Sequence, residues 1–340
     1  MPDEQEPMVE RDSGPAPTLS VVMPAYNAER YIGRAIESIL DQTFTDLELI
    51  IYLDAPTDGT AEVARQYAAR DSRVVIIDNE DSAGVCVGLN RAIAASHGTF
   101  IGRMDADDIS TPDRFARQLD VMRANPDVVI VGSDALHINT EDEILGLSIA
   151  GPRTAAEFRR LQAAGELTVV LDGTALMRRS ALEAVGGYDP SMPIAQEVDL
   201  HSRMASQGVV IAIGEPLLLY RLHPDSRVAT RFFEGRGMHR YVKARNRAIL
   251  EGRPTMSYLE YLASERDLPL SHRARIRLSD LGQFHYRTAG VRLAGGQSVA
   301  AVAHLSWAFL ASPGFVIGRA WHRRFSPEAR RMISDAGGRS

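Results

Sequence analysis

Cysteine is almost absent from this sequence, since Cys86 is the only one among 340 residues. An intramolecular disulfide framework and a zinc site built from cysteines both need several cysteines, so both are excluded. A single cysteine is most often a small buried apolar side chain, and we expect this of Cys86. The composition favours a reducing compartment.

The first residues lack the two features of a secretory signal peptide, a positively charged start and an apolar stretch. Residues 1–18 are instead acidic and rich in proline, which predicts a short disordered tail. We therefore expect a cytoplasmic protein.

Glycine is missing where two classes of nucleotide-binding enzyme need it. The first apolar run, residues 19–24, leads into the next helical pattern through AYNAERY, which contains no glycine. Dehydrogenases and phosphate-binding loops place glycines at this turn so that the backbone can approach phosphate groups. The sequence therefore argues against both classes.

Lysine is as scarce as cysteine, but arginine is abundant and unevenly distributed. From Thr230 to the end there are 19 basic and 8 acidic residues, a net charge of +11. The preceding part has 19 basic and 36 acidic residues, a net charge of −17. We expect an acidic body and a basic module with different partners.

Strand and helix patterns alternate from residue 19 onward. Apolar runs of strand length occur at 19–24, 47–54 and 74–79, and segments with apolar residues at helical spacing separate them. This alternation is typical of an α/β fold with a mostly parallel sheet between helices. Further strands are expected at 128–133, 167–171 and 208–214, and further helices at 84–96, 154–165, 175–185 and around Glu197.

The strand patterns stop near Asp225, where arginine-rich amphipathic helices take over. We therefore divide the chain into a tail (1–18), an α/β domain (19–228) and a basic, mainly helical C-terminal module (229–340).

An acidic tetrad follows one of the predicted strands. Ligands of an open parallel sheet bind outside the carboxyl ends of its strands, and Asp105-Ala106-Asp107-Asp108 lies at such an end. In an extended segment residues two apart share a side, so Asp105 and Asp107 should converge while Asp108 faces away. Converging carboxylates favour Mg²⁺ or Mn²⁺ that bridges a diphosphate. An acidic turn in which Asp108 caps the next helix is the alternative.

Several blocks in one order make residues 19 to about 226 resemble the family 2 glycosyltransferases. These blocks are VVMPAYNAERYIGRAIESILDQTF, DAPTDGT at 54–60, GRMDADDISTPDRF, VGGYD, QEVDL at 196–200 and YRLH. The resemblance implies a GT-A fold. It also implies an inverting transfer of a sugar from a nucleotide diphosphate donor to an acceptor hydroxyl, in glycan or polysaccharide biosynthesis.

The resemblance further implies donor-binding roles. Asp54 is expected to accept a hydrogen bond from a uracil ring, which predicts a UDP-sugar, and Asp107 to be the principal ligand of Mn²⁺ or Mg²⁺. Asp105 is placed near the ribose or the metal, and His223 near the diphosphate and metal, although a structural histidine is an equal alternative. The loop expected to pack on the nucleotide base consists of Pro24, Ala25, Tyr26 and Asn27.

Glu197 is the residue that matches the family's catalytic base. It is expected to take the proton of the acceptor hydroxyl, and an unperturbed glutamate is ionised at neutral pH. Asp199 is a nearby competitor, but residues two apart on a helix point to different sides. Asp172, Gly173 and Asp199 are assigned to the region of the donor sugar or acceptor. The alternative makes Glu197 a helix-surface acid.

The sequence departs from the family pattern at three places. Leu53 replaces an aspartate before Asp54, Gly-Leu-Asn at 88–90 replaces a frequent Ala-Arg-Asn, and Gln196-Glu197 replaces Glu-Asp. A cation expected near the donor is thus missing, and either Arg103 compensates for it or the donor differs.

Two other functions stay open at this point. A sugar-phosphate nucleotidyltransferase would have a glycine-rich, basic first loop, which the segment after Met23 lacks. A non-catalytic carbohydrate-binding or scaffold relative is compatible with the departures. No feature suggests a nucleic-acid partner.

We expect the C-terminal module to contact an anionic membrane surface or a lipid-linked acceptor, peripherally at the inner face of the membrane. The run 298–318 is apolar, but His304, Ser306, Ser312 and Pro313 interrupt it, which argues against a spanning helix. A helical hairpin packed on the catalytic domain, or a homodimer interface, is the alternative, and the sequence favours this alternative over an interfacial helix.

Overall fold

The computed structural model describes residues 16–192, 194–223, 231–320 and 330. Residues 1–15 of the predicted tail, the predicted boundary at 228 and the last part of the module (321–329 and 331–340) lie outside the described residues.

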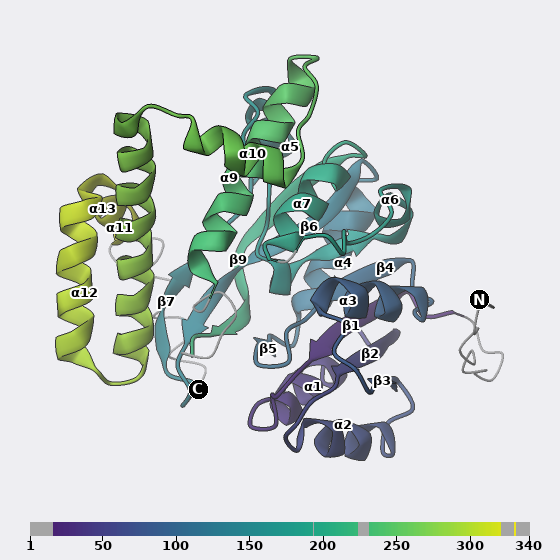
Figure 1. The fold of residues 1–340 in the computed structure, drawn as a ribbon. Helices are drawn as coiled ribbons and strands as arrows, with labels where there is room; N and C mark the ends of the chain where they lie inside the picture. Colours follow the sequence, from purple (N-terminus) through teal and green to yellow (C-terminus); the bar gives the residue numbers. More distant parts are fainter. Residues whose placement is uncertain (1–15, 193, 224–230, 321–329, 331–340) are drawn as a thin grey trace.

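One sheet connects the strands of the described chain in the order β3-β2-β1-β4-β8-β6-β9-β5 (Figure 1). Strand β7 lies outside this order and pairs with the last residues of β6, beyond those that pair with β8. Strands β3, β2, β1 and β4 are parallel, β8 is antiparallel to both of its neighbours, and β6 and β9 are parallel. The strands are β1 (Leu19–Ala25), β2 (Leu47–Asp54), β3 (Val74–Asn79), β4 (Phe100–Arg103), β5 (Ile109–Ser110), β6 (Val128–Ile138), β7 (Ile144–Ser148), β8 (Leu176–Arg178) and β9 (Val209–Arg221).

Helices cover both faces of this sheet, as the alternating pattern predicts (Figure 1). They are α1 (Ile32–Leu40), α2 (Thr60–Ala68), α3 (Val85–Ala94), α4 (Arg114–Ala124), α5 (Ala155–Ala163), α6 (Arg179–Ala184) and α7 (Gln196–Met204), with a 3₁₀ turn, η1 (Asp172–Thr174), before β8. The helices after the sheet are α9 (Phe232–Leu250), α10 (Tyr258–Arg266), α11 (Leu270–Ala294), α12 (Ser298–Ala311) and α13 (Pro313–Ala320).

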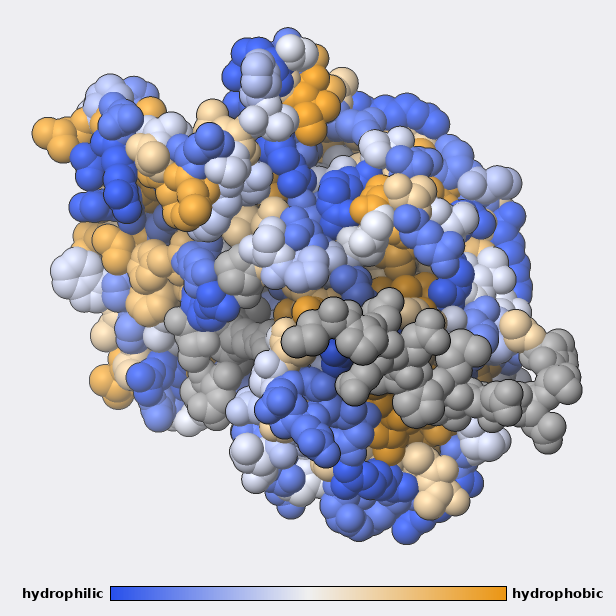
Figure 2. Space-filling model, turned by 45° about the vertical axis from the view of Figure 1, so that its right-hand side comes forward, coloured by the Kyte–Doolittle hydropathy of each residue, from blue (hydrophilic) through white to orange (hydrophobic). Residues whose placement is uncertain are grey.

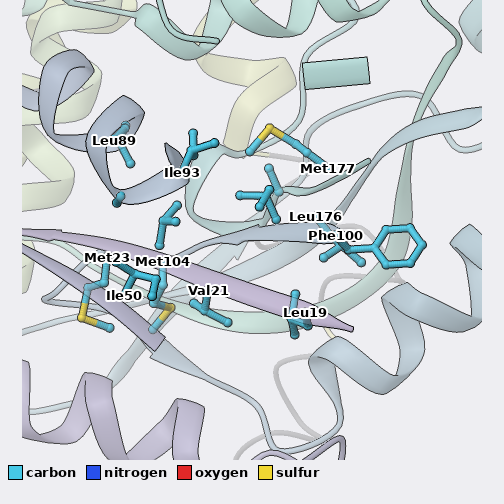
Figure 3. Packing of buried hydrophobic residues seen from close by; sticks show 14 of the residues in the cluster. Leu19, Val21, Met23, Ile50, Leu89, Ile93, Phe100, Met104, Leu176 and Met177 are labelled. Atoms are coloured by element: carbon cyan, nitrogen blue, oxygen red, sulfur yellow. The ribbon is translucent and has the colours of Figure 1, made fainter. Parts of the chain in front are cut away.

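The main core lies between α3 and the parallel half of the sheet. Strand β2 is buried along its whole length, as expected for a central parallel strand. A Cβ on Gly88 would lie only 2.4 Å from the ring of Tyr52, so this glycine lets α3 pack closely on β2. Figure 3 shows apolar side chains of this core, from β1, β4 and β8 and from Leu89 and Ile93 of α3. Cys86 is buried here, as predicted.

Two predicted elements are wrong. Residues 167–171 form no strand, because their side chains pack into two separate clusters and their backbone does not pair with the strands of the sheet. Val170 packs in the main core and Leu167 and Val169 pack against the cluster beside α7. The predicted helix 175–185 begins instead with strand β8, which pairs with β4 and β6, and the helix starts at Arg179.

The first C-terminal helix is part of the catalytic body. Met238, Tyr241 and Val242 of α9 share a buried cluster with Ala195 and Val198, which flank and lie on α7. Helices α11, α12 and α13 stand farther out as a separate layer (Figure 1). Among the described helices, none combines the length and apolar character needed to cross a membrane.

Candidate active site at the carboxyl edge of the sheet

The carboxyl ends of β1, β2 and β3 lie side by side, since Ala25 is in register with Leu53 and Asp54 with Asn79. Two residues just beyond these ends have left-handed backbones, Asn27 (φ 47°) and Ala55 (φ 52°), so both loops turn sharply.

The Asn27 side chain joins the loops after β1 and β2. Its Oδ1 accepts a hydrogen bond from the backbone N–H of Thr57 at 2.8 Å. Tyr26 is 53% exposed beside it, whereas Pro24 and Ala25 are still part of β1. The structure thus makes Tyr26 and Asn27 the accessible residues of the predicted base-binding loop.

Asp54 ends β2 with a buried carboxylate. One oxygen accepts a hydrogen bond from the backbone N–H of Ala83 at 2.9 Å, and the other accepts one from the hydroxyl of Ser82 at 3.0 Å. Each carboxylate oxygen has a second lone pair, so Asp54 can still accept from a ligand. Its first role, however, is to hold the loop after β3.

The acidic tetrad is a turn and not an extended segment, because the N–H of Asp108 lies 3.4 Å from the carbonyl oxygen of Asp105. The expected alternation therefore fails. A Cβ on Gly173 would lie 3.2 Å from Oδ2 of Asp108 and 3.3 Å from Oδ2 of Asp105, so these two carboxylates converge on Gly173. The prediction that Asp108 faces away is wrong.

Asp108 is 1% exposed and only partly satisfied. Its Oδ1 accepts a hydrogen bond from the N–H of Arg221 at 2.9 Å, while its Oδ2 is buried without a hydrogen-bond partner among the described residues. Burial, with the charges of Asp107 and Asp105, raises the pKa of Asp108 well above its usual value. A buried carboxylate oxygen without a donor indicates a missing positive partner.

Asp107 points to the other side of the turn. Its Oδ2 lies 2.8 Å from Nε2 of His223, just beyond β9. The carbonyl oxygen of Asp107 accepts a hydrogen bond from Nε of Arg221 at 2.8 Å, and this guanidinium also lies over the ring of Tyr31. The structure brings the predicted ligands Asp107 and His223 together.

Arg103 is 3% exposed and lies between two carboxylates. It donates to Oδ1 of Asp105 at 2.8 Å, and its Nε lies 3.2 Å from Oδ2 of Asp172 as an ion pair. Burial alone would lower the pKa of Arg103, but the two carboxylates outweigh burial and raise it. Arg103 thus holds the carboxylates of Asp105 and Asp172 in place, and its hydrogen bonds and ion pairs with the described residues do not include the loop of Asp54.

Arg114 is a second buried cation beneath the site. Its guanidinium donates to the carbonyl oxygen of Arg103 at 2.8 Å and to Gln118 at 3.1 Å. Gln118 in turn donates to the carbonyl oxygen of Thr174, in the turn that carries Asp172 and Gly173. Burial lowers the pKa of Arg114 to about 9, which still leaves it cationic at neutral pH.

The Asp172 side of the site is positioned from α3. The side chain of Asn90 accepts from the N–H of Tyr188 at 2.9 Å and donates to its carbonyl oxygen at 2.8 Å. The hydroxyl of Tyr188, which is buried, lies 3.5 Å from Oδ1 of Asp172. Burial and the charge of Asp105 raise the pKa of Asp172, although Arg103 opposes them.

Glu197 is the second residue of α7, whose N-terminal cap, Ala195, has a left-handed backbone. Its carboxylate makes no side-chain hydrogen bond or ion pair with another described residue, so it is free to face a ligand. Burial and the charge of Asp172 raise the pKa of Glu197 to about 8. The expectation of an unperturbed, fully ionised glutamate is therefore wrong for the free site.

Asp199 has a different environment two residues later. It is fully buried, and its oxygens bind Arg203 at 2.6 Å and Arg245 of α9 at 2.6 Å. Both oxygens are engaged by guanidinium groups, so the carboxylate joins α9 to α7, and its place in the donor-sugar or acceptor region stays a prediction.

The site as a whole carries more negative than positive charge. The site contains four aspartates (105, 107, 108 and 172) and Glu197, whereas Arg103 forms ion pairs with two of these carboxylates, those of Asp105 and Asp172. Within the described ranges, no three His, Cys, Asp or Glu side chains form a cage that would hold a metal ion alone. The closeness of Asp107 to His223 and the orphaned oxygen of Asp108 nevertheless fit a divalent ion that takes its remaining ligands from a diphosphate.

Sequence reasoning missed several positioning residues. Arg114 stands in the block GRMDADDISTPDRF, Tyr188 in VGGYD and Arg221 in YRLH, so the blocks themselves were the available signal. Arg245 lies outside every block, and no sequence pattern pointed to it.

Comparisons with known proteins agree with this geometry. Residues 20–186 match the family described as Glycosyl transferase family 2. EpsE of Bacillus subtilis, named as a glycosyltransferase, is 33% identical over 195 residues, which cover 56% of this chain and 68% of EpsE.

Two solved structures show the same fold at low sequence identity. S. aureus TarS 1-349 in complex with UDP-GlcNAc has a TM-score of 0.54 and 16% identity, and the match covers 88% of this chain and 92% of that one. The mannosyltransferase PcManGT from Pyrobaculum calidifontis, in complex with GDP-Man and Mn²⁺, has a TM-score of 0.53 and 19% identity, covering 97% and 88%. These likenesses confirm the predicted GT-A fold.

Proposed function

The chain belongs to the family 2 glycosyltransferases, and we propose that it is a metal-dependent, inverting enzyme that moves a sugar from a UDP-sugar to an acceptor hydroxyl. The observation that carries this proposal is that one site contains two different kinds of acidic group, the carboxylates of the turn 105–108 and the separate carboxylate of Glu197. The carboxylates of Asp105 and Asp108 meet beside Gly173, and one oxygen of Asp108 has no hydrogen-bond partner among the described residues. The charges of Asp172, Arg103 and Asp105 act on Glu197, which has no side-chain partner among the described residues.

The donor is assigned to the edge formed by the loops after β1, β2 and β4. Tyr26 offers an exposed ring to a base, and Asp54 has lone pairs left for the imide N–H of uracil. The neighbouring structures contain UDP-GlcNAc in one case and GDP-Man in the other, which supports a nucleotide sugar. The uridine preference rests on Asp54 alone.

Asp107, Asp105 and His223 would hold Mn²⁺ or Mg²⁺, and the carboxylate of Asp108 lies next to that of Asp105 beside Gly173. The Mn²⁺ in the PcManGT complex supports this assignment. When bound, such an ion neutralises the charge that develops on the departing diphosphate. Arg221 fixes the turn through the backbone of Asp107 and the carboxylate of Asp108, so the ligands are positioned before the donor arrives.

Glu197 is assigned as the base. The acceptor oxygen attacks the anomeric carbon from the side opposite the diphosphate, the bond from this carbon to the diphosphate oxygen breaks, and the acceptor proton moves to Glu197. A raised pKa suits this role, because a base works best when its pKa is near the operating pH. The positive charge of a divalent ion, when bound, would lower the pKa of Glu197 and favour the ionised form.

The acceptor is proposed to be a glycan or lipid-linked glycan hydroxyl in polysaccharide biosynthesis. We place the catalytic domain at 19–228, with α9 packed on it as support for α7. A cytoplasmic enzyme, peripheral at the inner membrane face, would meet such an acceptor.

Release of nucleoside diphosphate from a panel of nucleotide sugars, with Mn²⁺ and with excess chelator, tests the proposal. We expect release from UDP-sugars that chelator abolishes, and loss of activity in Asp107→Asn and Glu197→Gln. Full activity in chelator would contradict the metal dependence, and equal use of GDP-sugars would contradict the uridine preference. Turnover of a nucleoside triphosphate with a sugar phosphate would assign a nucleotidyltransferase instead, and donor binding without turnover would assign a non-catalytic relative.

A further inference from the structure

We propose that the exposed face of α11, α12 and α13 docks on an anionic membrane surface. This inference does not depend on the proposed reaction, because it rests on the outer helical layer, away from the acidic site.

Helix α12 and the start of α13 are apolar on nearly every side. Residues 298–318 contain no Asp, Glu, Lys or Arg. Large apolar side chains in this stretch are strongly exposed, among them Val299 (88%), Leu310 (74%), Val302 (64%), Trp307 (62%) and Ile317 (60%). Figure 2 shows hydrophobic surface between hydrophilic areas on the side of the C-terminal helices. A helix that is apolar all round is normally covered.

The contact with α11 covers only a narrow strip of α12. Ala301 and Ala308 are buried there, and a Cβ on Gly282 of α11 would lie 2.6 Å from the Cβ of Ser312, so the seam consists of small residues in close approach. The larger side chains of α12 therefore face outward and need another apolar partner.

The charges beside this apolar face have one sign. Residues 268–320 contain six arginines and one acid, Asp280. Asp280 is 6% exposed and is bound by Arg236 and Arg240 of α9, so within residues 268–320 no exposed carboxylate accompanies the arginines. Arg275, Arg277 and Arg292 are exposed on α11.

A groove at the α11–α12 seam offers a place for a phosphate group. Its volume is about 350 Å³, and Arg275 lines it together with Ser271, Ser279 and Ser312. One guanidinium and three hydroxyls are suitable donors for a lipid phosphate.

This charge pattern favours lipid over a second copy of the chain. A two-fold dimer places the same patch against itself, which would bring the arginines of both copies together without any acid to pair them. An anionic bilayer instead supplies negative charge next to an apolar interior, the combination that binds helices lying in the interface. Since none of the described helices spans a membrane, the layer would lie on the bilayer.

Flotation of the full chain with vesicles tests this proposal. We expect binding to vesicles with about one-third phosphatidylglycerol at low salt, weak binding to pure phosphatidylcholine, and release at high salt because the arginine contribution is screened. Val299→Ser/Val302→Ser/Leu310→Ser should reduce binding to anionic vesicles at least tenfold.

Matched triple variants separate this surface from general effects. Ile249→Ser/Leu250→Ser/Leu259→Ser removes equally exposed apolar side chains of α9 and α10 and should bind like the wild type. Arg275→Gln/Arg277→Gln/Arg292→Gln should lose most of the preference for anionic vesicles. Arg117→Gln/Arg159→Gln/Arg253→Gln, with the same change in net charge at exposed sites elsewhere, should keep it.

Thermal unfolding and donor binding of each variant check that the catalytic body stays folded. Wild-type protein that remains unbound at low salt, or an α12 variant that floats like the wild type, overturns the proposal. So does a dimer in solution that the α12 variant dissociates, because the face would then belong to a second copy.

Discussion

Glu197 and Asp199 show how far two neighbouring acids on one helix can differ. Asp199 is neutralised by Arg203 and Arg245, whereas Glu197 has no side-chain partner among the described residues and a pKa raised to about 8. Glu197 is therefore costly for the fold in its ionised form, as expected for a group kept for chemistry.

Glu197→Gln should stabilise the free protein in a pH-dependent way. Because the folded-state pKa is raised from 4.5 to about 8, the native state holds the proton more tightly, and wild-type stability falls as pH rises through this window. Glutamine has no charge to desolvate, so the variant should gain about 1–2 kcal/mol at pH 8.5 after allowance for solvent screening, roughly 3–6 °C in Tm, and nothing at pH 4. Calorimetry at both pH values measures this.

Asp199→Asn is the matched control, since it changes a neighbouring acid in the same way. It leaves two buried guanidinium groups without their carboxylate and should destabilise the protein at pH 8.5. Equal Tm values for Glu197→Gln and the wild type at pH 8.5 would mean that the Glu197 carboxylate is well solvated.

Gly173→Ala should weaken metal binding. The added Cβ would lie 3.2–3.3 Å from oxygens of Asp108 and Asp105, the carboxylates that converge there. We expect the Mn²⁺ concentration for half-maximal activity to rise about tenfold, a typical effect for residues next to metal ligands. Gly214→Ala, with no atom within 4 Å of the added Cβ, is the control, and identical metal titrations of the two variants would contradict the assignment.

At the scale of elements, the sequence predicts the parallel half of the sheet well. Strands β2 and β3 match the predicted runs, and the apolar residues of α1 are the buried ones, because periodicity reports which face is covered. The failures have two causes, since the apolar residues 167–171 pack into two clusters without pairing as a strand, whereas β8 is too short to show a period and is a strand only through its pairing with β4 and β6.

Site prediction failed for similar reasons. The sequence indicates the acidic tetrad but not its turn, which brings Asp108 next to Asp105, and the network of Arg114, Gln118 and Thr174 exists only after α4 packs beneath β4. Arg245 reaches α7 from a helix that follows the whole sheet.

Arg114→Met should destabilise α4 and the site together. Methionine fills much of the space but leaves the carbonyl oxygen of Arg103 and the amide oxygen of Gln118 without their donor, which should cost about 2–4 kcal/mol. Urea unfolding measures the loss. Arg123→Met on the exposed side of the same helix should stay within about 0.5 kcal/mol of the wild type, and similar midpoints for both variants would contradict a supporting role for Arg114.

At the scale of the molecule, the chain combines an acidic catalytic body with a basic outer layer. Helix α9 connects the two, since its Arg245 and Tyr241 contact α7 or its flank while its Arg236 and Arg240 bind Asp280 of α11. The acidic and basic parts of the sequence are therefore also separate in space. Helix α9 fixes the position of the proposed membrane face relative to α7, the helix that carries Glu197.

The central claim is transfer with inversion by Glu197. Its most direct test is the anomer of the free sugar released first when water replaces the acceptor, followed by proton NMR before mutarotation, with an α-linked UDP-sugar and Mn²⁺. Attack opposite the diphosphate predicts that the β anomer appears first, and that Glu197→Gln slows its appearance at least about a hundredfold. The α anomer as first product, or an unchanged rate in the variant, would contradict this account.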